Sequence, residues 1–268
     1  MLRYAKESDY EGLEPGTNTK VWQERFLIET LRAYVTPNSR VLEVGANDNT
    51  LILDAIGIGE HWIADPYDGG GAGVLPEPPE LDPRIIISRC KIGVSSNALP
   101  GDYFDVIFSS SVLEHIGQRE TGFDTRYTPN PPEAQEAPRR AFCRECLRLL
   151  KPGGVTIHTI DHGVRNITFD ANFREAGFEP LEPSASVTHR EMLDDPEALR
   201  QTMSWHDKSK PLHPGVAKLN TVLALGYRKP VGTPRLWAQL PEHSIDPTLA
   251  DRPPKTPTPW RTKNSSEA

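Results

Sequence analysis

The sequence predicts a doubly wound α/β domain, in which a mostly parallel sheet is covered by helices on both faces. From Arg40 onward, short apolar runs alternate with stretches of helical periodicity, as expected of βαβ units. Several runs, such as 41–44 and 104–108, are largely apolar, which is typical of strands buried on both faces. The 268 residues are enough for one sizeable core with extensions.

The elements follow in order along the chain. Residues 1–19 are polar and we expect them to be irregular, whereas apolar residues recur at helical spacing over 20–35. Short apolar runs predict strands at 40–44, 61–65, 84–88, 104–109, 154–160, 178–182 and 221–228. Helices are predicted between them at 49–57, 111–117, 134–150 and 168–176.

Changes in composition divide the chain into three predicted regions. Residues 1–37 form an N-terminal helical extension or cap, residues 38–229 the folded domain, and residues 230–268 a proline-rich tail that is extended or disordered. Two long loops, 66–83 and 117–132, interrupt the alternation and are either binding loops or surface insertions.

Charge and composition exclude several classes of protein. With 30 basic and 37 acidic residues the net charge is −7, which argues against nucleic acid or an anionic membrane surface as a partner. No apolar run has the length of a membrane span, and the first residues lack the apolar stretch of a signal peptide. Three cysteines do not make a disulfide framework, so we expect a cytoplasmic protein.

The first strand leads into a predicted nucleotide pocket. Gly45, at the end of the strand, allows a ligand to approach the backbone closely. Asp65 ends the second strand about 20 residues later, the spacing at which an acid accepts hydrogen bonds from ribose hydroxyls. Glu43 and Asp48 would repel a pyrophosphate, so the turn favours a cationic ligand, such as a sulfonium with an α-amino group.

Four segments in the same order resemble class I S-adenosylmethionine-dependent methyltransferases, especially the small-molecule branch. They are 43–47, 104–116, 147–157 and 171–178, and the resemblance covers 38–229. It implies a Rossmann-like sheet of seven strands whose last strand is antiparallel, with S-adenosyl-L-methionine as cofactor. The antiparallel strand fits the run at 221–228.

The resemblance also assigns the cofactor site. It implies that Glu43 and Gly45 hold the methionine part, that Asp65 binds the ribose, and that residues 109–111 line the methyl group. Asn47 and Asn49 stand where the family has glycines, and Ser95 lies where the family often has an acid beside the adenine. The predicted cofactor-binding residues are Glu43, Gly45, Ala46, Asn47, Asp65, Pro66, Ser95, Ser109, Ser110 and Ser111.

Candidates for a general base are histidines near the carboxyl edge of the sheet, where open α/β folds bind ligands. His162 follows a strand beside Asp161, and His115 follows Ser111; both are candidate catalytic residues, with His189 and His206 behind them. No metal site is predicted, because the C-x-x-C at 143–146 has no second pair of ligands.

The sequence therefore predicts a methyltransferase that acts on a small-molecule acceptor, at oxygen or nitrogen. We expect the helix at 20–35 and the loop at 117–133 to cover the acceptor. The alternative is a catalytically silent relative that binds ligands or serves as a subunit of a complex. An oxidoreductase is disfavoured because the G-x-G-x-x-G motif is missing, and a homo-oligomer stays open.

Overall fold

The computed structural model describes residues 2–6, 19–46, 51–57, 59–69, 75–117, 132–160, 168–181, 189–198 and 222–232. Of the two units into which the chain divides, Met1–Thr233 and Pro234–Ala268, the described residues all belong to the first. Residues 233–268 of the predicted tail therefore lie outside the described residues, as do most of the loop at 117–132 and residues 70–74 of the loop at 66–83. The domain boundaries near residues 37 and 229 stay predictions.

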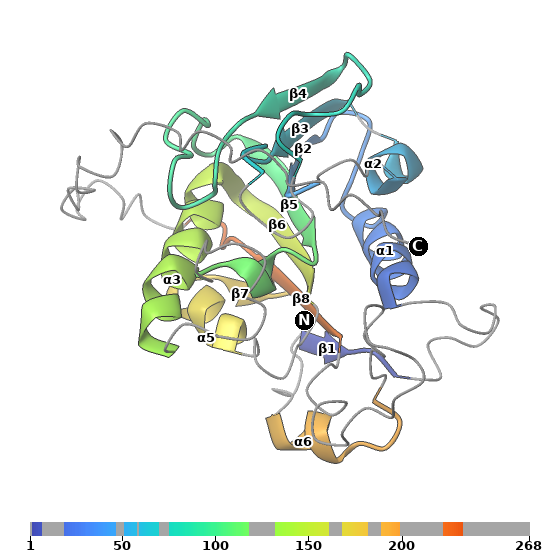
Figure 1. The fold of residues 1–268 in the computed structure, drawn as a ribbon, viewed down its shortest axis with the longest axis vertical. Helices are drawn as coiled ribbons and strands as arrows, with labels where there is room; N and C mark the ends of the chain where they lie inside the picture. Colours follow the sequence, from blue (N-terminus) through green and yellow to red (C-terminus); the bar gives the residue numbers. More distant parts are fainter. Residues whose placement is uncertain are drawn as a thin grey trace, which may run out of the picture. The chain divides into compact units, whose positions relative to one another are not determined.

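The described residues form one eight-stranded sheet (Figure 1). Its order is β1-β8-β6-β5-β2-β3-β4, and β7 pairs with β8 beside this path. The strands are β1 (Leu2–Tyr4), β2 (Arg40–Val44), β3 (Glu60–Ala64), β4 (Ile85–Ser88), β5 (Phe104–Ser110), β6 (Leu150–Ile160), β7 (Glu179–Pro180) and β8 (Leu223–Arg228). β8 is antiparallel to each of its partners, and β2 to β6 are parallel to one another.

This arrangement confirms the predicted fold class, including the reversed last strand, but corrects the number of strands. The sheet has eight strands instead of seven, because β1 adds to the free edge of β8, with Leu2 opposite Leu225. Residues 2–4 are thus not irregular. The pattern of three residues is too short to show a strand, and only β8, far away in sequence, provides its hydrogen-bonding partner.

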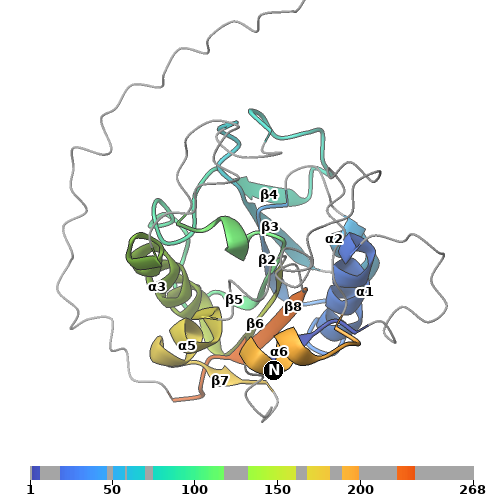
Figure 2. The same cartoon turned by 60° about the horizontal axis from the view of Figure 1, so that its bottom comes forward.

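Helices cover both faces of the sheet (Figure 2). One layer holds α1 (Thr19–Leu31) and α2 (Leu51–Ile56), and the other holds α3 (Pro132–Leu149) and α5 (Thr168–Glu175). Neighbouring residues of β6 show the two sides: Ile157 belongs to the core under α1, whereas the ring of His158 stacks on Phe173 of α5. A chain that alternates strands and helices produces this doubly wound arrangement.

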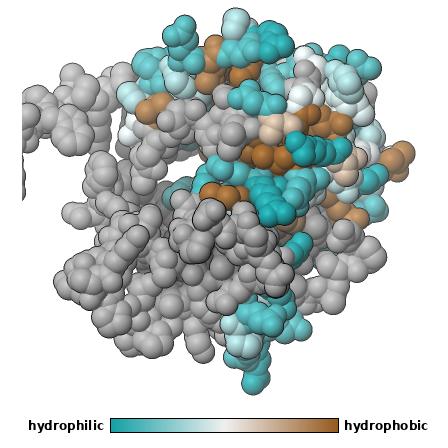
Figure 3. Space-filling view, turned by 90° about the vertical axis from the view of Figure 1, so that its right-hand side faces the viewer, coloured by the Kyte–Doolittle hydropathy of each residue, from teal (hydrophilic) through white to brown (hydrophobic). Residues whose placement is uncertain are grey.

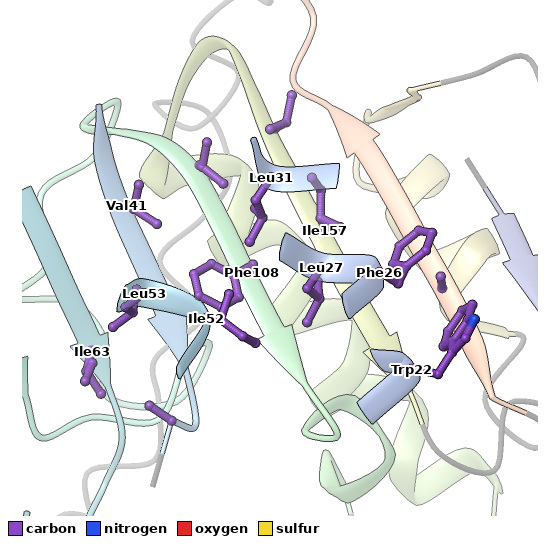
Figure 4. Packing of buried hydrophobic residues seen from close by; sticks show 14 of the residues in the cluster. Trp22, Phe26, Leu27, Leu31, Val41, Ile52, Leu53, Ile63, Phe108 and Ile157 are labelled. Atoms are coloured by element: carbon purple, nitrogen blue, oxygen red, sulfur yellow. The ribbon is translucent and has the colours of Figure 1, made fainter. Parts of the chain in front are cut away.

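The apolar face of α1 forms a large part of the core (Figure 4). Trp22, Phe26, Leu27 and Leu31 are at most 8% exposed and pack with residues of α2 and the central strands, including Phe108. Burial of four such side chains contributes roughly 6–12 kcal/mol before entropic costs. Figure 4 also shows that α1 runs against the direction of β5, so its amino end lies toward the carboxyl ends of the parallel strands.

Some element boundaries differ from the prediction for local reasons. The helix expected at 111–117 is only a short 3-10 turn, η2 (Leu113–His115), because Ser111 takes a positive φ of 55° that a right-handed helix excludes. α1 ends at Leu31 instead of residue 35, and β6 begins at Leu150, four residues before the predicted start. A short helix at α6 (His189–Asp194) was not predicted.

Where described residues form the surface on the side of α1 and α2, hydrophilic side chains predominate and hydrophobic ones lie between them (Figure 3). Among the described residues, the exposed large hydrophobic side chains are Val21, Ile86, Val94 and Val231. They come from different elements, which is ordinary for a globular protein and identifies no docking surface.

Candidate functional site

The candidate site lies at the carboxyl ends of β2, β3 and β5. From β2 the chain proceeds outward to β3 and β4 and then returns to β5, which pairs with the other side of β2. The crevice at such a switch point is where open α/β sheets bind ligands. The predicted residues Glu43, Gly45 and 109–111 therefore come together at this place, and Asp65 follows the adjacent strand.

Gly45 ends β2 in a conformation that other residues rarely adopt. Its φ is +70°, and a Cβ atom there would lie 2.6 Å from Cγ2 of Val112. The position thus needs glycine for two reasons, the backbone angle and the close approach of the turn after β5. Ala46, the next residue, is buried.

Two further residues with positive φ follow the neighbouring strands. Tyr67 (φ 46°) comes after β3, and Ser111 (φ 55°) comes after β5. Such residues cost about 1–3 kcal/mol each unless the surroundings hold them, and they gather at functional sites. Three residues with positive φ, Gly45, Tyr67 and Ser111, thus lie at one edge of the sheet. Their position supports the assignment of this edge as the candidate site.

Asp65 lies at this edge and is 3% exposed. Its Oδ1 accepts a hydrogen bond from the backbone N–H of Tyr67 at 3.0 Å, which holds the turn Asp65-Pro66-Tyr67. Asp65 thus directly follows β3, and its role as a ribose-binding acid stays a prediction; Pro66, half-buried, is part of the same turn.

Glu43 is buried on the α1 side of β2. It is 3% exposed, and its Oε2 has no hydrogen-bond partner among the described residues. Burial raises its pKa to about 8; the charge of Lys20 lowers the pKa and that of Glu24 raises it further. This corrects the charge argument made from the sequence: Glu43 is mainly protonated at neutral pH, and a cation placed beside it would favour its ionised form.

The three serines at the carboxyl end of β5 have different partners. Ser109 is fully buried, and its Oγ lies 2.7 Å from Nδ1 of His158, among the side chains packed with α3 and α5. Its hydroxyl is thus engaged away from the predicted cofactor site. The other two serines contact α1: Lys20 Nζ donates to Ser110 Oγ at 2.8 Å, and Ser111 Oγ donates to Gln23 Oε1 at 2.9 Å.

Sequence reasoning missed Lys20 and Gln23 as site residues. The helix at 20–35 was expected to cover the acceptor, but no residue of it was assigned. A signal for their role is present in the sequence, because the polar residues Lys20 and Gln23 lie on either side of the apolar Trp22. In the structure both Trp22 and Gln23 are buried. The partners of Lys20 and Gln23 could not be read from the sequence, since α1 and β5 are separated by about 90 residues.

The remaining predicted residues lie as follows. Ser95 is exposed after β4, and its Oγ accepts a hydrogen bond from the backbone N–H of Lys91 at 3.0 Å. His115 is exposed at the end of η2. Asn47, Asn49, Asp48, Asp161, His162 and His206 lie outside the described residues, and the side chain of His189 does as well.

His158, a residue of β6, has a structural role. It is fully buried, and its two ring nitrogens lie 2.7 Å from Ser109 Oγ and 2.6 Å from Thr156 Oγ1. Burial lowers its pKa to about 3, so the imidazole is neutral. No group of three or more potential metal ligands occurs among the described residues, and no described helix has the length and apolar character to cross a membrane.

No family model and no curated protein matches the chain. Among solved structures, the [4+2]-cyclase SpnF is 18% identical, with 78% of this chain and 81% of that chain covered and a TM-score of 0.44.

Two further structures are methyltransferases. The 1,6-didemethyltoxoflavin-N1-methyltransferase of Burkholderia thailandensis, solved with 1,6-didemethyltoxoflavin and S-adenosylhomocysteine, is 15% identical over 77% of this chain and 78% of its own, with a TM-score of 0.43. The N-methyltransferase NodS of Bradyrhizobium japonicum WM9 is 14% identical over 77% and 94%, with a TM-score of 0.44. At these values the function must be argued from the chain's own residues.

Proposed function

We propose that the protein is an S-adenosylmethionine-dependent methyltransferase that acts on a small-molecule acceptor. The observation that carries the proposal is the pairing of two buried carboxyl groups at the switch point of the sheet. Glu43 has an oxygen without a partner among the described residues, and Asp65 directly follows the next strand. Three residues with positive φ, Gly45, Tyr67 and Ser111, follow strands at the same edge.

These residues fit the cofactor in its chemistry. A buried carboxyl with an unused oxygen suits a ligand that has an ammonium and a sulfonium, because a cation stabilises the ionised form of Glu43. Gly45 follows Glu43 in a left-handed conformation, and the side chain of Val112 occupies the space beside its Cα atom. Asp65 would accept hydrogen bonds from the ribose hydroxyls, as its place after β3 suggests.

When bound, the cofactor supplies an electrophilic methyl group: the acceptor's lone pair forms the new bond to carbon, the carbon–sulfur electron pair returns to sulfur, and the acceptor's proton leaves. The contribution of the chain is to hold the acceptor in line with that bond, which is worth up to about 7–11 kcal/mol in favourable cases. Ser110 and Ser111, held by α1, stand at the edge where the resemblance puts the methyl group.

A general base would remove the proton of the acceptor, and His115 and His162 stay the proposed candidates for this base. The side chain of His115 is exposed beyond the turn after β5. An acceptor with a low pKa would need neither residue, since water would remove the proton.

The test is calorimetric titration with S-adenosylhomocysteine of the wild type and of Asp65→Asn. Asparagine keeps an oxygen for the N–H of Tyr67, so the turn survives while the charge is lost. We expect micromolar binding to the wild type and at least about tenfold weaker binding to the variant. Asp82→Ala, at an exposed acid before β4, is the matched control and should bind as the wild type does.

Absence of binding by the wild type at millimolar ligand would refute the proposal and favour the catalytically silent alternative. Equal affinity of Asp65→Asn and the wild type, with the same thermal unfolding, would show that the ligand binds elsewhere.

A further inference from the structure

The amino end of α1 and the carboxyl end of β5 present a short row of polar groups. Lys20 and Gln23 lie on α1 within one turn of each other, and they bond the neighbouring hydroxyls of Ser110 and Ser111. The row stands beside Glu43, whose pKa responds to the charge of Lys20. It is therefore adjacent to the proposed cofactor site but contains none of the buried carboxyl groups.

Lys20 differs from the other lysines in the described part of the chain. The four others each form an ion pair with an aspartate: Lys6 with Asp195, Lys91 with Asp68, Lys151 with Asp105 and Lys229 with Asp102. Lys20 instead donates to a neutral hydroxyl at 2.8 Å, and no carboxylate of the described residues lies within ion-pair distance of it.

The two nearby acidic residues leave the charge of Lys20 largely uncompensated. In the unliganded protein Glu43 is mainly protonated at neutral pH, because burial raises its pKa to about 8, and with the cofactor bound its ionised form would balance the cation of the cofactor. Glu24 lies one turn further along α1 and forms no ion pair with Lys20. An ammonium group has three donors, so two remain after the bond to Ser110. A half-buried cation with unused donors favours an anion nearby.

We propose that the methyl acceptor carries a carboxylate group, and that Lys20, held by Ser110, binds this carboxylate at the end of β5. The proposal rests on the proposed function, because it names the substrate class of the same site. A carboxylate is favoured over a phosphate because one ammonium balances one negative charge, and the row offers no arginine for bidentate binding. A cationic cofactor beside the acceptor also favours an anion.

The experiment compares the wild type with Lys20→Met, Lys20→Arg and the control Arg25→Met. Arg25 lies on the same helix, half-exposed and paired with Glu29, so its loss removes a cation without touching the row. Calorimetry with S-adenosylhomocysteine comes first and tests the proposed function by itself. Arg25→Met should bind this ligand as the wild type does, and acceptor binding to each variant is then compared on protein saturated with it.

The second step screens hydroxy- and amino-substituted carboxylic acids, each with its primary amide, by release of S-adenosylhomocysteine. We expect acids to be methylated with at least about tenfold higher kcat/KM than their amides. For the best acid, Lys20→Met should raise KM about tenfold or more with a smaller change in kcat, and Lys20→Arg should restore most of the loss. Titration of that acid into protein saturated with S-adenosylhomocysteine should show the same order of Kd values.

Three results would overturn the proposal while the proposed function stands: amides accepted as well as acids, an unchanged Kd for the acid in Lys20→Met, or no acid methylated by a protein that binds S-adenosylhomocysteine. If the wild type does not bind S-adenosylhomocysteine, the proposed function fails, and this inference fails with it.

Discussion

Replacement of Glu43 by glutamine should stabilise the unliganded protein, and the gain should grow with pH. The buried carboxyl of Glu43 has a pKa of about 8, compared with an ordinary value of 4.5. Between these two values the folded protein holds a proton that the unfolded chain has released. Because the folded state binds more protons, its stability falls as pH rises through this window, and the fall is complete above pH 8.

The size of the effect follows from the difference in pKa. Each pKa unit corresponds to about 1.36 kcal/mol, so titration of Glu43 destabilises the wild type by about 1 kcal/mol at pH 5.5 and about 4–5 kcal/mol at pH 8.5. Glutamine has a similar shape and does not titrate, and its own cost of burial is the same at both pH values. The advantage of Glu43→Gln over the wild type should thus be about 3 kcal/mol larger at pH 8.5 than at pH 5.5.

Urea unfolding at the two pH values, without cofactor, measures this difference. Thermal unfolding should agree, since about 3 kcal/mol corresponds to roughly 6–12 °C for a domain of this size. The control is Glu29→Gln, on the exposed side of α1, which should change stability by less than about 0.5 kcal/mol at either pH. An advantage of Glu43→Gln that is equal at both pH values would refute the reasoning, because Glu43 would then not titrate in the window.

Two further predictions concern the turn after β2 and the buried imidazole. Gly45→Ala should destabilise the protein by about 2–4 kcal/mol in urea unfolding, because the new side chain would combine a positive φ with a Cβ atom 2.6 Å from Val112. The control is Gly57→Ala, at a φ of +58° with nothing within 4 Å of the new Cβ atom, and it should cost only about 1–2 kcal/mol. Equal losses would show that the contact with Val112 is unimportant. The imidazole of His158 should show no titration by NMR between pH 5 and 8, since burial lowers its pKa to about 3, and a midpoint near 6.5 would contradict its burial.

The layered fold was predictable because its signals are local. The strands β2, β3, β4, β5 and β8 lie within one or two residues of their predicted limits, since each is a continuous apolar run. β1 was missed because a strand of three residues leaves no pattern, and its partner β8 comes more than 200 residues later. The helix expected after β5 was wrong because a single residue, Ser111, turns the backbone to a positive φ.

The candidate site was predictable in position but not in its electrostatics. Glu43 lies near the end of β2, Gly45 follows β2 and Asp65 follows β3, and the topology of a parallel sheet brings these positions to one edge. Their burial could not be read from the chain, and burial decides the protonation of Glu43. Likewise, the hydroxyl of Ser109 was expected at the cofactor, but alternation along β5 directs it to His158 on the other face.

The sequence by itself determined the alternation of strands and helices and the turn residues at the carboxyl edge, because these depend on neighbours within a few positions. The reversed direction of β8 was implied only by the family resemblance. Only the tertiary structure decided that Lys20 of α1 meets Ser110 of β5 and that Glu43 lies without a partner for its Oε2 among the described residues. The physical reason is that hydrogen bonding and desolvation depend on which segments pack together. Contacts across about 90 residues leave no periodic trace in the chain.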